Sequence, residues 1–179
     1  MVTLERDAAS ELWERWFSEL RYNWIKVEVL QDYTGEEQSA SLEAWLDGDE
    51  ERALALLADE DTAWAQLTHA KADQNIQLIR FHIVDEPLTP YLKWEIEVYK
   101  RRNILLGGEK VFLINRKDMP DIVLPSGDFM IFDEARAVIN TYDDTGRMTH
   151  ETFYEETDDI SHLLAPLAVL EANAIVVEP

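Results

Sequence analysis

Apolar side chains near the start of the chain recur at intervals of three or four residues, which is the spacing of an amphipathic helix. Over residues 6 to 20 this stripe comprises Ala9, Leu12, Trp13, Trp16, Phe17 and Leu20, with charged residues on the opposite side. From Asn23 to Leu30 the period shortens to two, which predicts a β-strand with one apolar side formed by Ile25, Val27 and Val29. Between residues 39 and 71, cap residues precede short apolar stripes. They predict three short acidic helices that begin near Ser39, Asp49 and Asp61.

The middle and the end of the chain alternate between strand and helix patterns. Residues 79 to 83 predict a strand that ends before Pro87. The following residues 90 to 98 fit either a strand or one face of a helix, and Thr89 as a cap with Pro90 at the first helical position favours the helix. Gly107 and Gly108 end it. Further strands are predicted over residues 110–115, 122–124, 129–132, 137–142 and 148–155, and a final helix begins near Asp158, with Pro166 as a kink or an early break.

This order of elements predicts a single globular domain over residues 1–179 of the α+β class. We expect a largely antiparallel sheet, an N-terminal amphipathic helix, short acidic helices and a C-terminal helix. A hydrophobic fraction of 46% is too high for a disordered chain.

Amino-acid composition limits where in the cell we expect the protein and which chemical groups it can use. The chain has no cysteine, which excludes disulfides, thiolate metal sites and cysteine nucleophiles. The first residues lack the basic and apolar regions of a signal peptide, and no apolar run reaches the ~20 residues that cross a bilayer. We therefore expect a soluble cytoplasmic protein that does not bind membranes.

The charge is distributed unevenly along the chain. The net charge is −21, yet nine of the 16 Lys and Arg residues lie between residues 61 and 120. The two flanks are strongly acidic. Such a chain repels nucleic-acid phosphates at long range and favours a basic partner. The alternative is that the acids only keep the surface solvated.

Several blocks between Tyr22 and Tyr154 combine aromatic, charged and turn residues in a distinctive order. They are residues 24–28 with Tyr33, residues 45–48, 80–84 and 87–95, Asn103 with Gly108 and Glu109, and residues 124–133 and 142–146. In these blocks the chain resembles a family of small actinobacterial proteins with a domain of unknown function, DUF6879. Met130 stands where the family pattern usually has an aromatic residue, and the N-terminal helix is particular to this chain. The resemblance implies a cytoplasmic protein, often encoded beside helix-turn-helix regulators, and it brings no established reaction.

Motifs for metal, nucleotide or hydrolytic chemistry are not matched by the sequence. The histidines are far apart and lack zinc-site spacing, so we expect no metal and no cofactor; they are His69, His82, His150 and His162. The Gly107–Lys110 turn lacks the P-loop pattern, and Ser126 lacks the glycines of a nucleophile elbow. Asp128 and Asp133 are five residues apart, so on one strand they face opposite sides and cannot form a catalytic pair.

The basic and aromatic middle of the chain supplies the candidate ligand site. If the strand over residues 79 to 83 packs beside the segment after Pro90, a concave patch results, suited to a phosphate, a carboxylate or an acidic peptide. Its residues are Arg80, His82, Tyr91, Lys93, Trp94, Glu95 and Arg101. The alternative is that Arg80 or Lys93 pairs with Glu28, Glu95 or Asp128 inside the same domain, because buried Arg and Lys side chains need partners.

Three functions remain open at this point. The first is a non-enzymatic binding module, an acidic partner or modulator of another protein such as a helix-turn-helix regulator. Its acidic contact residues would be Glu36, Glu37, Asp47, Asp49, Glu50 and Glu51. The second is an enzyme or small-ligand receptor in which Arg80, Tyr91 and Lys93 orient an anion, while Glu95 or His82 handles a proton. Direct DNA binding is the third and the least favoured electrostatically.

Overall fold

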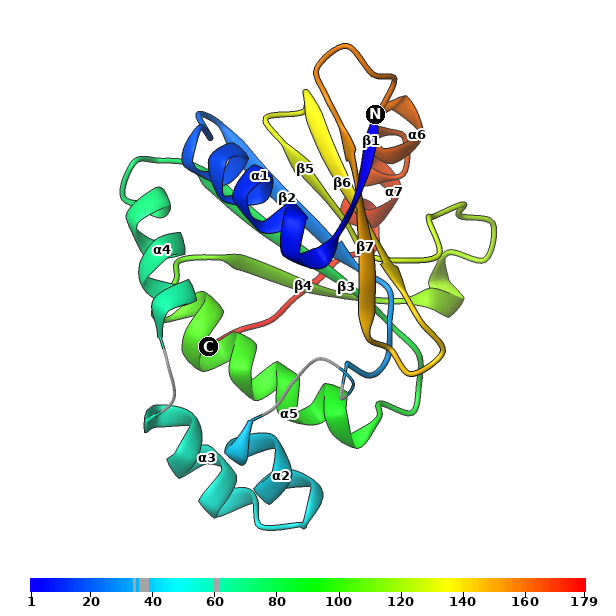
Figure 1. The fold of residues 1–179 in the computed structure, drawn as a ribbon. Helices are drawn as coiled ribbons and strands as arrows, with labels where there is room; N and C mark the ends of the chain where they lie inside the picture. Colours follow the sequence, from blue (N-terminus) through cyan, green and yellow to red (C-terminus); the bar gives the residue numbers. More distant parts are fainter. Residues whose placement is uncertain (34, 36–38, 60–61) are drawn as a thin grey trace.

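The fold is described from a computed structural model that covers residues 1–33, 35, 39–59 and 62–179. One eight-stranded sheet runs through it, in the order β1-β7-β6-β5-β2-β3-β4-β8 (Figure 1). The strands are β1 (Val2–Glu5), β2 (Asn23–Glu28), β3 (Gln77–Val84), β4 (Lys110–Asn115), β5 (Phe129–Phe132), β6 (Arg136–Tyr142), β7 (Met148–Tyr154) and β8 (Ile175–Val176). The fold is α+β with a mixed sheet. Its antiparallel pairs outnumber the parallel pairs, which are β2 with β3 and β3 with β4.

Helices connect the parallel strands. The helices are α1 (Arg6–Ser18), α2 (Ala40–Leu46), α3 (Glu50–Asp59), α4 (Ala63–Ala72), α5 (Pro90–Val98), α6 (Ser161–Leu164) and α7 (Leu167–Ala172). A π-helical segment, η1 (Tyr99–Ile104), extends α5, and a 3-10 turn, η2 (Arg116–Asp118), follows β4. No helix among the described residues has the length and apolar character that crossing a bilayer requires.

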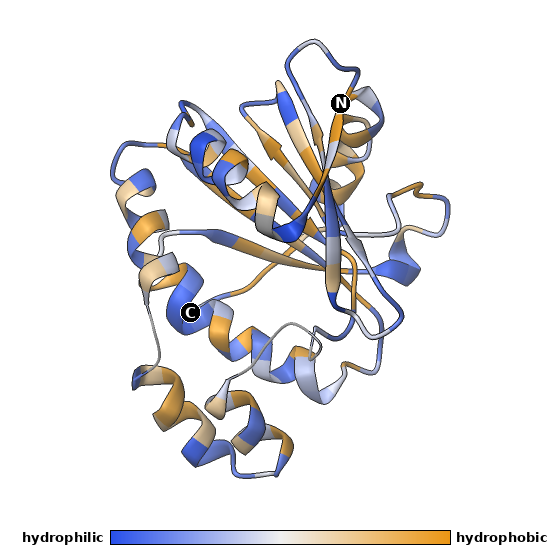
Figure 2. Cartoon of the chain, in the orientation of Figure 1, coloured by the Kyte–Doolittle hydropathy of each residue, from blue (hydrophilic) through white to orange (hydrophobic). Residues whose placement is uncertain are grey.

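The sheet separates two differently built layers. Strand residues such as Val27, Phe81 and Ile131 pack on one face against α6 and α7. On the other face, α1 packs over one end of the strands and α5 over the other end. Figure 2 shows apolar stretches along α6 and α7 and through the strands beside them. The helices α2 and α3 lie beyond α5, away from the sheet (Figure 1).

Most of the predicted elements are present, with local differences. The helix after Thr89 is confirmed, because the Thr89 hydroxyl accepts the backbone N–H of Leu92 and Pro90 is its first residue. The C-terminal helix is broken at Pro166 into α6 and α7. The strand predicted over residues 122–124 is wrong; these residues form an irregular loop before β5. The edge strands β1 and β8 were not predicted, because four and two residues are too short to show a clear period.

Candidate functional site

One face of the sheet carries a row of polar side chains that crosses five neighbouring strand positions. We call it the polar row; it consists of His82, Glu28, Asp128, Asn140 and Glu151. Glu28 pairs with His82 across β2 and β3, and Asn140 pairs with Glu151 across β6 and β7. Asp128 directly precedes β5, and its carbonyl oxygen accepts the backbone N–H of Asn140 at 2.8 Å. Because side chains alternate along a strand, these residues share the face that α1 and α5 cover.

A cavity of about 850 Å³ lies over this row, between α1 and α5. Its wall is unusually aromatic and includes Trp13, Trp24, Trp64, Trp94, Tyr33, Tyr91, Tyr99 and Tyr142. All members of the polar row except His82 line it. The cavity therefore combines an aromatic wall with a floor of carboxyl and amide groups.

Arg80 is the central cation of this floor and is only 5% exposed. Its NH1 donates to Oε1 of Glu28 at 2.6 Å, and its Nε donates to Oε2 of Glu109 at 2.9 Å. Burial works against its charge, but Glu109 and Glu28 outweigh this and raise the pKa of Arg80 further. Burial likewise disfavours ionised Glu28, yet Arg80 and Lys26 lower the pKa of Glu28 far below its usual range. Arg80, Glu28 and Glu109 are therefore paired with one another without a ligand.

His82 is fully buried and is held at both ring nitrogens. Its Nε2 lies 2.8 Å from the carbonyl oxygen of Leu30, which can only accept, so Nε2 donates. The Tyr99 hydroxyl donates its one proton to Oε2 of Glu28 at 2.7 Å. Nδ1 of His82 lies 2.8 Å from the same hydroxyl. Both ring nitrogens of His82 are thus engaged, next to the carboxylate of Glu28.

Asp128 joins three segments of the chain. Its carboxylate accepts the backbone N–H of Val29 and the hydroxyls of Tyr33 and Tyr142, each at 2.8 Å. Burial raises the pKa of Asp128, although these hydrogen bonds and Lys26 act in the opposite direction. At Gly127 the chain passes so close to β6 that a Cβ atom would overlap the carbonyl oxygen of Asn140. Only glycine lets Asp128 enter the row at this point.

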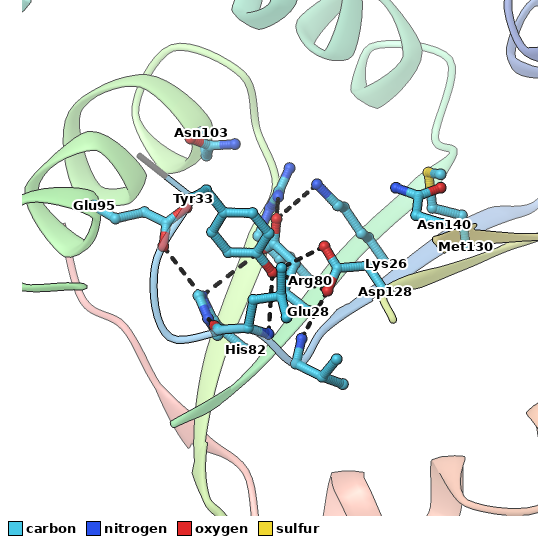
Figure 3. A network of polar contacts seen from close by, with 12 residues as sticks. Lys26, Glu28, Tyr33, Arg80, His82, Glu95, Asn103, Asp128, Met130 and Asn140 are labelled. Atoms are coloured by element: carbon cyan, nitrogen blue, oxygen red, sulfur yellow. Dashed lines mark hydrogen bonds and ion pairs between the residues drawn. The ribbon is translucent and has the colours of Figure 1, made fainter. Parts of the chain in front are cut away.

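Two further carboxyl groups of the cavity, those of Glu95 and Glu151, are also buried. Glu95, 8% exposed, accepts the Tyr91 hydroxyl at Oε1, whereas its Oε2 accepts no hydrogen bond from the described residues. This Oε2 lies 3.3 Å from Nδ1 of His82. Figure 3 marks this contact with a dashed line. Burial raises the pKa of Glu95 to about 7. Glu151 is 6% exposed, and burial raises its pKa although Arg6 and Lys26 lower it.

The family model for DUF6879, a domain of unknown function, matches residues 11–178, which contain the complete polar row. The chain belongs to the DUF6879 family. No curated protein matches it. The resemblance inferred from the sequence blocks is thus confirmed, and the chemistry of this DUF6879 protein must be derived from its side chains.

A metal ion is one candidate ligand for the DUF6879 site. Glu28, His82 and Glu95 each offer one ligand atom, all within 4.8 Å of one another. However, Oε1 of Glu28 lies 2.6 Å from both Lys26 and Arg80, and two cations at that distance oppose a third. The Tyr99 hydroxyl also bridges Glu28 and His82, where a metal ion would have to enter. The ion pairs and hydrogen bonds already present explain the arrangement of Glu28, His82 and Glu95 better than a metal site does.

The structure brings together only part of the predicted ligand patch. Arg80, Tyr91, Trp94 and Glu95 line the cavity, and His82 lies directly beneath it. Lys93 is exposed on α5 and does not line the cavity. Arg101 pairs with Glu97 at 3.2 Å on the outer side of η1. The Trp94 indole donates to Ser41 at 2.9 Å, which ties α5 to α2.

The predicted partner-binding acids lie elsewhere. Asp47, Asp49, Glu50 and Glu51 are exposed at the turn between α2 and α3. Asp49 also accepts the backbone N–H of Arg52 and so caps α3. Glu36 and Glu37 lie outside the described residues.

Sequence reasoning predicted Glu28 and Asp128 as candidate internal partners of Arg80 or Lys93, and the Arg80–Glu28 pair is confirmed. It missed further residues of the cavity and its floor, namely Lys26, Tyr99, Glu109, Asn140 and Glu151. The signal was present in β2, where Lys26 and Glu28 alternate with Ile25 and Val27. Such alternation usually places the charged face in water. Here helices cover that face as well, so the charges are buried and must pair with each other.

Proposed function

We propose that this DUF6879 protein is a non-enzymatic binding module that holds a small organic cation in the cavity between α1 and α5. The observation that carries this proposal is Oε2 of Glu95. It belongs to a side chain that is 8% exposed, lines the cavity and accepts no hydrogen bond at this oxygen from the described residues. A buried acceptor without a donor costs about 1–3 kcal/mol, and a ligand N–H would remove that cost.

The charge of the floor supports a cation. Five carboxyl groups line the cavity, those of Glu14, Glu28, Glu95, Asp128 and Glu151. Four basic side chains line it as well, those of Arg6, Lys26, Arg80 and Arg102. The carboxyl groups outnumber the basic side chains by one, which leaves negative charge for a ligand to neutralise. Burial of these surplus groups explains why Glu95, Glu151 and Asp128 all have a raised pKa.

The wall supports a cation with a planar or apolar body. Trp13, Trp24 and Trp64 lie close to one another beside the floor, with ring centroids 5.6 and 5.7 Å apart for the pairs that include Trp64. Aromatic faces attract cations by about 0.5–2 kcal/mol, more when water is excluded. Nε1 of Trp24 donates no hydrogen bond to the described residues, so an acceptor on a ligand can bind it.

The predicted anionic ligand is less well supported by these contacts. It relied on Arg80 and Lys93, but Arg80 already binds Glu28 and Glu109, and Lys93 lies outside the cavity. An anion would have to displace buried carboxylates from Arg80. His82 has both ring nitrogens engaged, which also argues against a proton-transfer role at the cavity surface.

Three ligands of nearly equal shape test the proposal: benzamidine, which is cationic, benzamide, which is neutral, and benzoate, which is anionic. We expect isothermal titration calorimetry to show benzamidine binding at least about tenfold more tightly than benzamide, because its hydrogen bond to Glu95 is charge-assisted. Benzoate should bind weakest. Benzoate binding best would support the anionic ligand and overturn our proposal.

Two variants locate the binding. Glu95→Gln should weaken benzamidine about tenfold or more and leave benzamide nearly unchanged. The matched control is Glu97→Gln on the same helix, whose carboxylate pairs with Lys100 and Arg101 outside the cavity. Equal losses in both variants would contradict a site at Glu95.

A second candidate is the basic protein partner predicted from the acidic flanks. The supporting observation is that Asp47, Asp49, Glu50 and Glu51 form one exposed turn on α2 and α3, away from the sheet. A pull-down from a native host should then recover a basic protein, such as a helix-turn-helix regulator, and release it as salt rises. Replacing these four acids by Asn or Gln should abolish recovery. The control variant, Asp144→Asn with Glu155→Gln, Glu156→Gln and Glu171→Gln, should retain it.

A further inference from the structure

The cavity offers a second place for a cation, distant from Glu95. Glu151 on β7 is 6% exposed and lines the cavity together with Arg6, an exposed side chain whose charge lowers the pKa of Glu151 without offsetting the effect of burial. Beside it in the polar row, Oδ1 of Asn140 is buried and accepts no hydrogen bond from the described residues. A carboxyl group next to a vacant amide acceptor is suited to a group with several N–H donors, such as an ammonium.

The two places lie at opposite ends of the polar row. Glu95 contacts the ring of His82, whose strand is β3, whereas Glu151 belongs to β7. Four strand intervals separate β3 from β7 in the sheet order, which at ~4.8 Å each amounts to ~19 Å between backbones. In Figure 3, Asn140 lies on the side of Asp128 that faces away from His82 and Glu95. One elongated ligand is required to reach both ends.

The middle of the row offers little to a charged group. Asp128 is already bound by Val29, Tyr33 and Tyr142. Lys26, whose side chain is 22% exposed, lines the cavity here and pairs with Glu28. Its positive charge repels a cation at this point, while the neighbouring rings of Tyr33 and Tyr142 contact apolar groups well.

We propose that the cavity binds a linear organic dication, with one cationic end at Glu95, the other at Glu151 and Asn140, and an uncharged chain between them. This inference rests on the proposed function and specifies its ligand class as long α,ω-diamines. Polyamines with internal ammonium groups should bind less well than a diamine of equal length, because an internal charge would lie near Lys26.

The experiment is a calorimetric length series of diaminobutane, diaminohexane, diaminooctane, diaminodecane and diaminododecane. Each is compared with the amino alcohol of the same chain length, in which a hydroxyl replaces one ammonium. We expect the ratio of the two affinities to be near one for the short members. It should rise to at least about tenfold in the longer half of the series, where both ends can bind at once.

Single variants assign the two ends. Glu95→Gln and Glu151→Gln should each reduce the best diamine to about the affinity of its amino alcohol, and Glu97→Gln should change nothing. Spermine should bind more weakly than the diamine of nearest length. All variants are compared at equal folded fraction, measured by circular dichroism.

The outcomes separate the two proposals. A ratio that stays near one at every length, or a Glu151→Gln variant that binds like the wild type, overturns the dication. If the dication proposal is overturned but benzamidine still binds through Glu95, the proposed function stands without the dication. If neither benzamidine nor any diamine binds, both proposals fail.

Discussion

The two faces of the central sheet are formed by the same strands, but one buries apolar side chains and the other buries charged ones. The face toward α6 and α7 buries Val27, Phe81, Ile131 and their neighbours without charge. The face toward α1 and α5 buries the polar row together with Arg80. A buried apolar face stabilises the fold by excluding water, whereas buried charges seldom add net stability. On our proposal, the polar face serves ligand binding rather than stability.

The largest effect is expected when the ion pairs of the polar face are broken. Arg80→Met should lower the free energy of unfolding by about 3–5 kcal/mol at pH 7, because it leaves the buried carboxylate of Glu109 without its cation and removes one of the cations that pair with Glu28. Urea unfolding measures this loss. A loss below about 1 kcal/mol would show that the polar face is better solvated than its burial indicates.

A substitution that creates a cavity on the apolar face should lower the free energy of unfolding somewhat less than Arg80→Met does, and this loss should depend differently on pH. Ile131→Ala, at a fully buried position, should cost about 3 kcal/mol. Because no titrating group is removed, the loss should be equal at pH 5 and pH 8. Unfolding curves for Arg80→Met and Ile131→Ala at both pH values therefore distinguish the two faces. A pH-dependent loss in Ile131→Ala would contradict their separation.

Glu95 should make the stability of the wild type fall as pH rises. Its pKa is raised in the folded state to about 7, from 4.5 when unfolded, so the folded state binds the proton more tightly. Its stabilising contribution is complete below pH 4.5 and is lost between there and pH 7, by at most about 3 kcal/mol. Glu95→Gln should remove most of this decline, as measured by urea unfolding across the range. A variant with an unchanged pH profile would refute the assignment to Glu95.

The ionisation of Glu95 should also govern ligand binding, but here a rise in pH should strengthen binding rather than weaken stability. A cation binds the ionised carboxylate, so benzamidine affinity should increase as pH rises from 6 to 8, by about tenfold. Binding below pH 7 should release a proton, which calorimetry in buffers of different ionisation enthalpy detects. Benzamide, which carries no charge, is the control and should show no such dependence.

The smallest effect is expected at Lys26. Its side chain is partly exposed, and its partner Glu28 keeps Arg80 and Tyr99 when Lys26 is lost. Lys26→Met should therefore cost no more than about 1 kcal/mol. A loss as large as that of Arg80→Met would mean that Lys26 is as essential to the buried network as Arg80.

Local sequence patterns predicted much of the secondary structure because capping and alternation act over a few residues. Ser39 caps α2 through its side chain as expected, and the alternation of β2 and β3 matches the two faces of the sheet. The candidate site was found only in part. Arg80, Tyr91 and Glu95 were predicted to lie in one patch and they line one cavity, but Asp128 was interpreted as a turn residue. Its partners Tyr33 and Tyr142 are 95 and 14 residues away along the chain, so no local pattern could show them.

The sequence by itself determined the family, the α+β class, the acidic excess and the surplus of bases in its middle. The tertiary structure decided what those bases do, because the pairing of β2 with β3 and β5 set Lys26, Glu28 and Arg80 side by side. It also decided that this charged face is buried, since α1 and α5 return over it from distant parts of the chain. Burial, which no local pattern encodes, is what leaves Glu95 and Glu151 with raised pKa values in a cavity lined with aromatic rings.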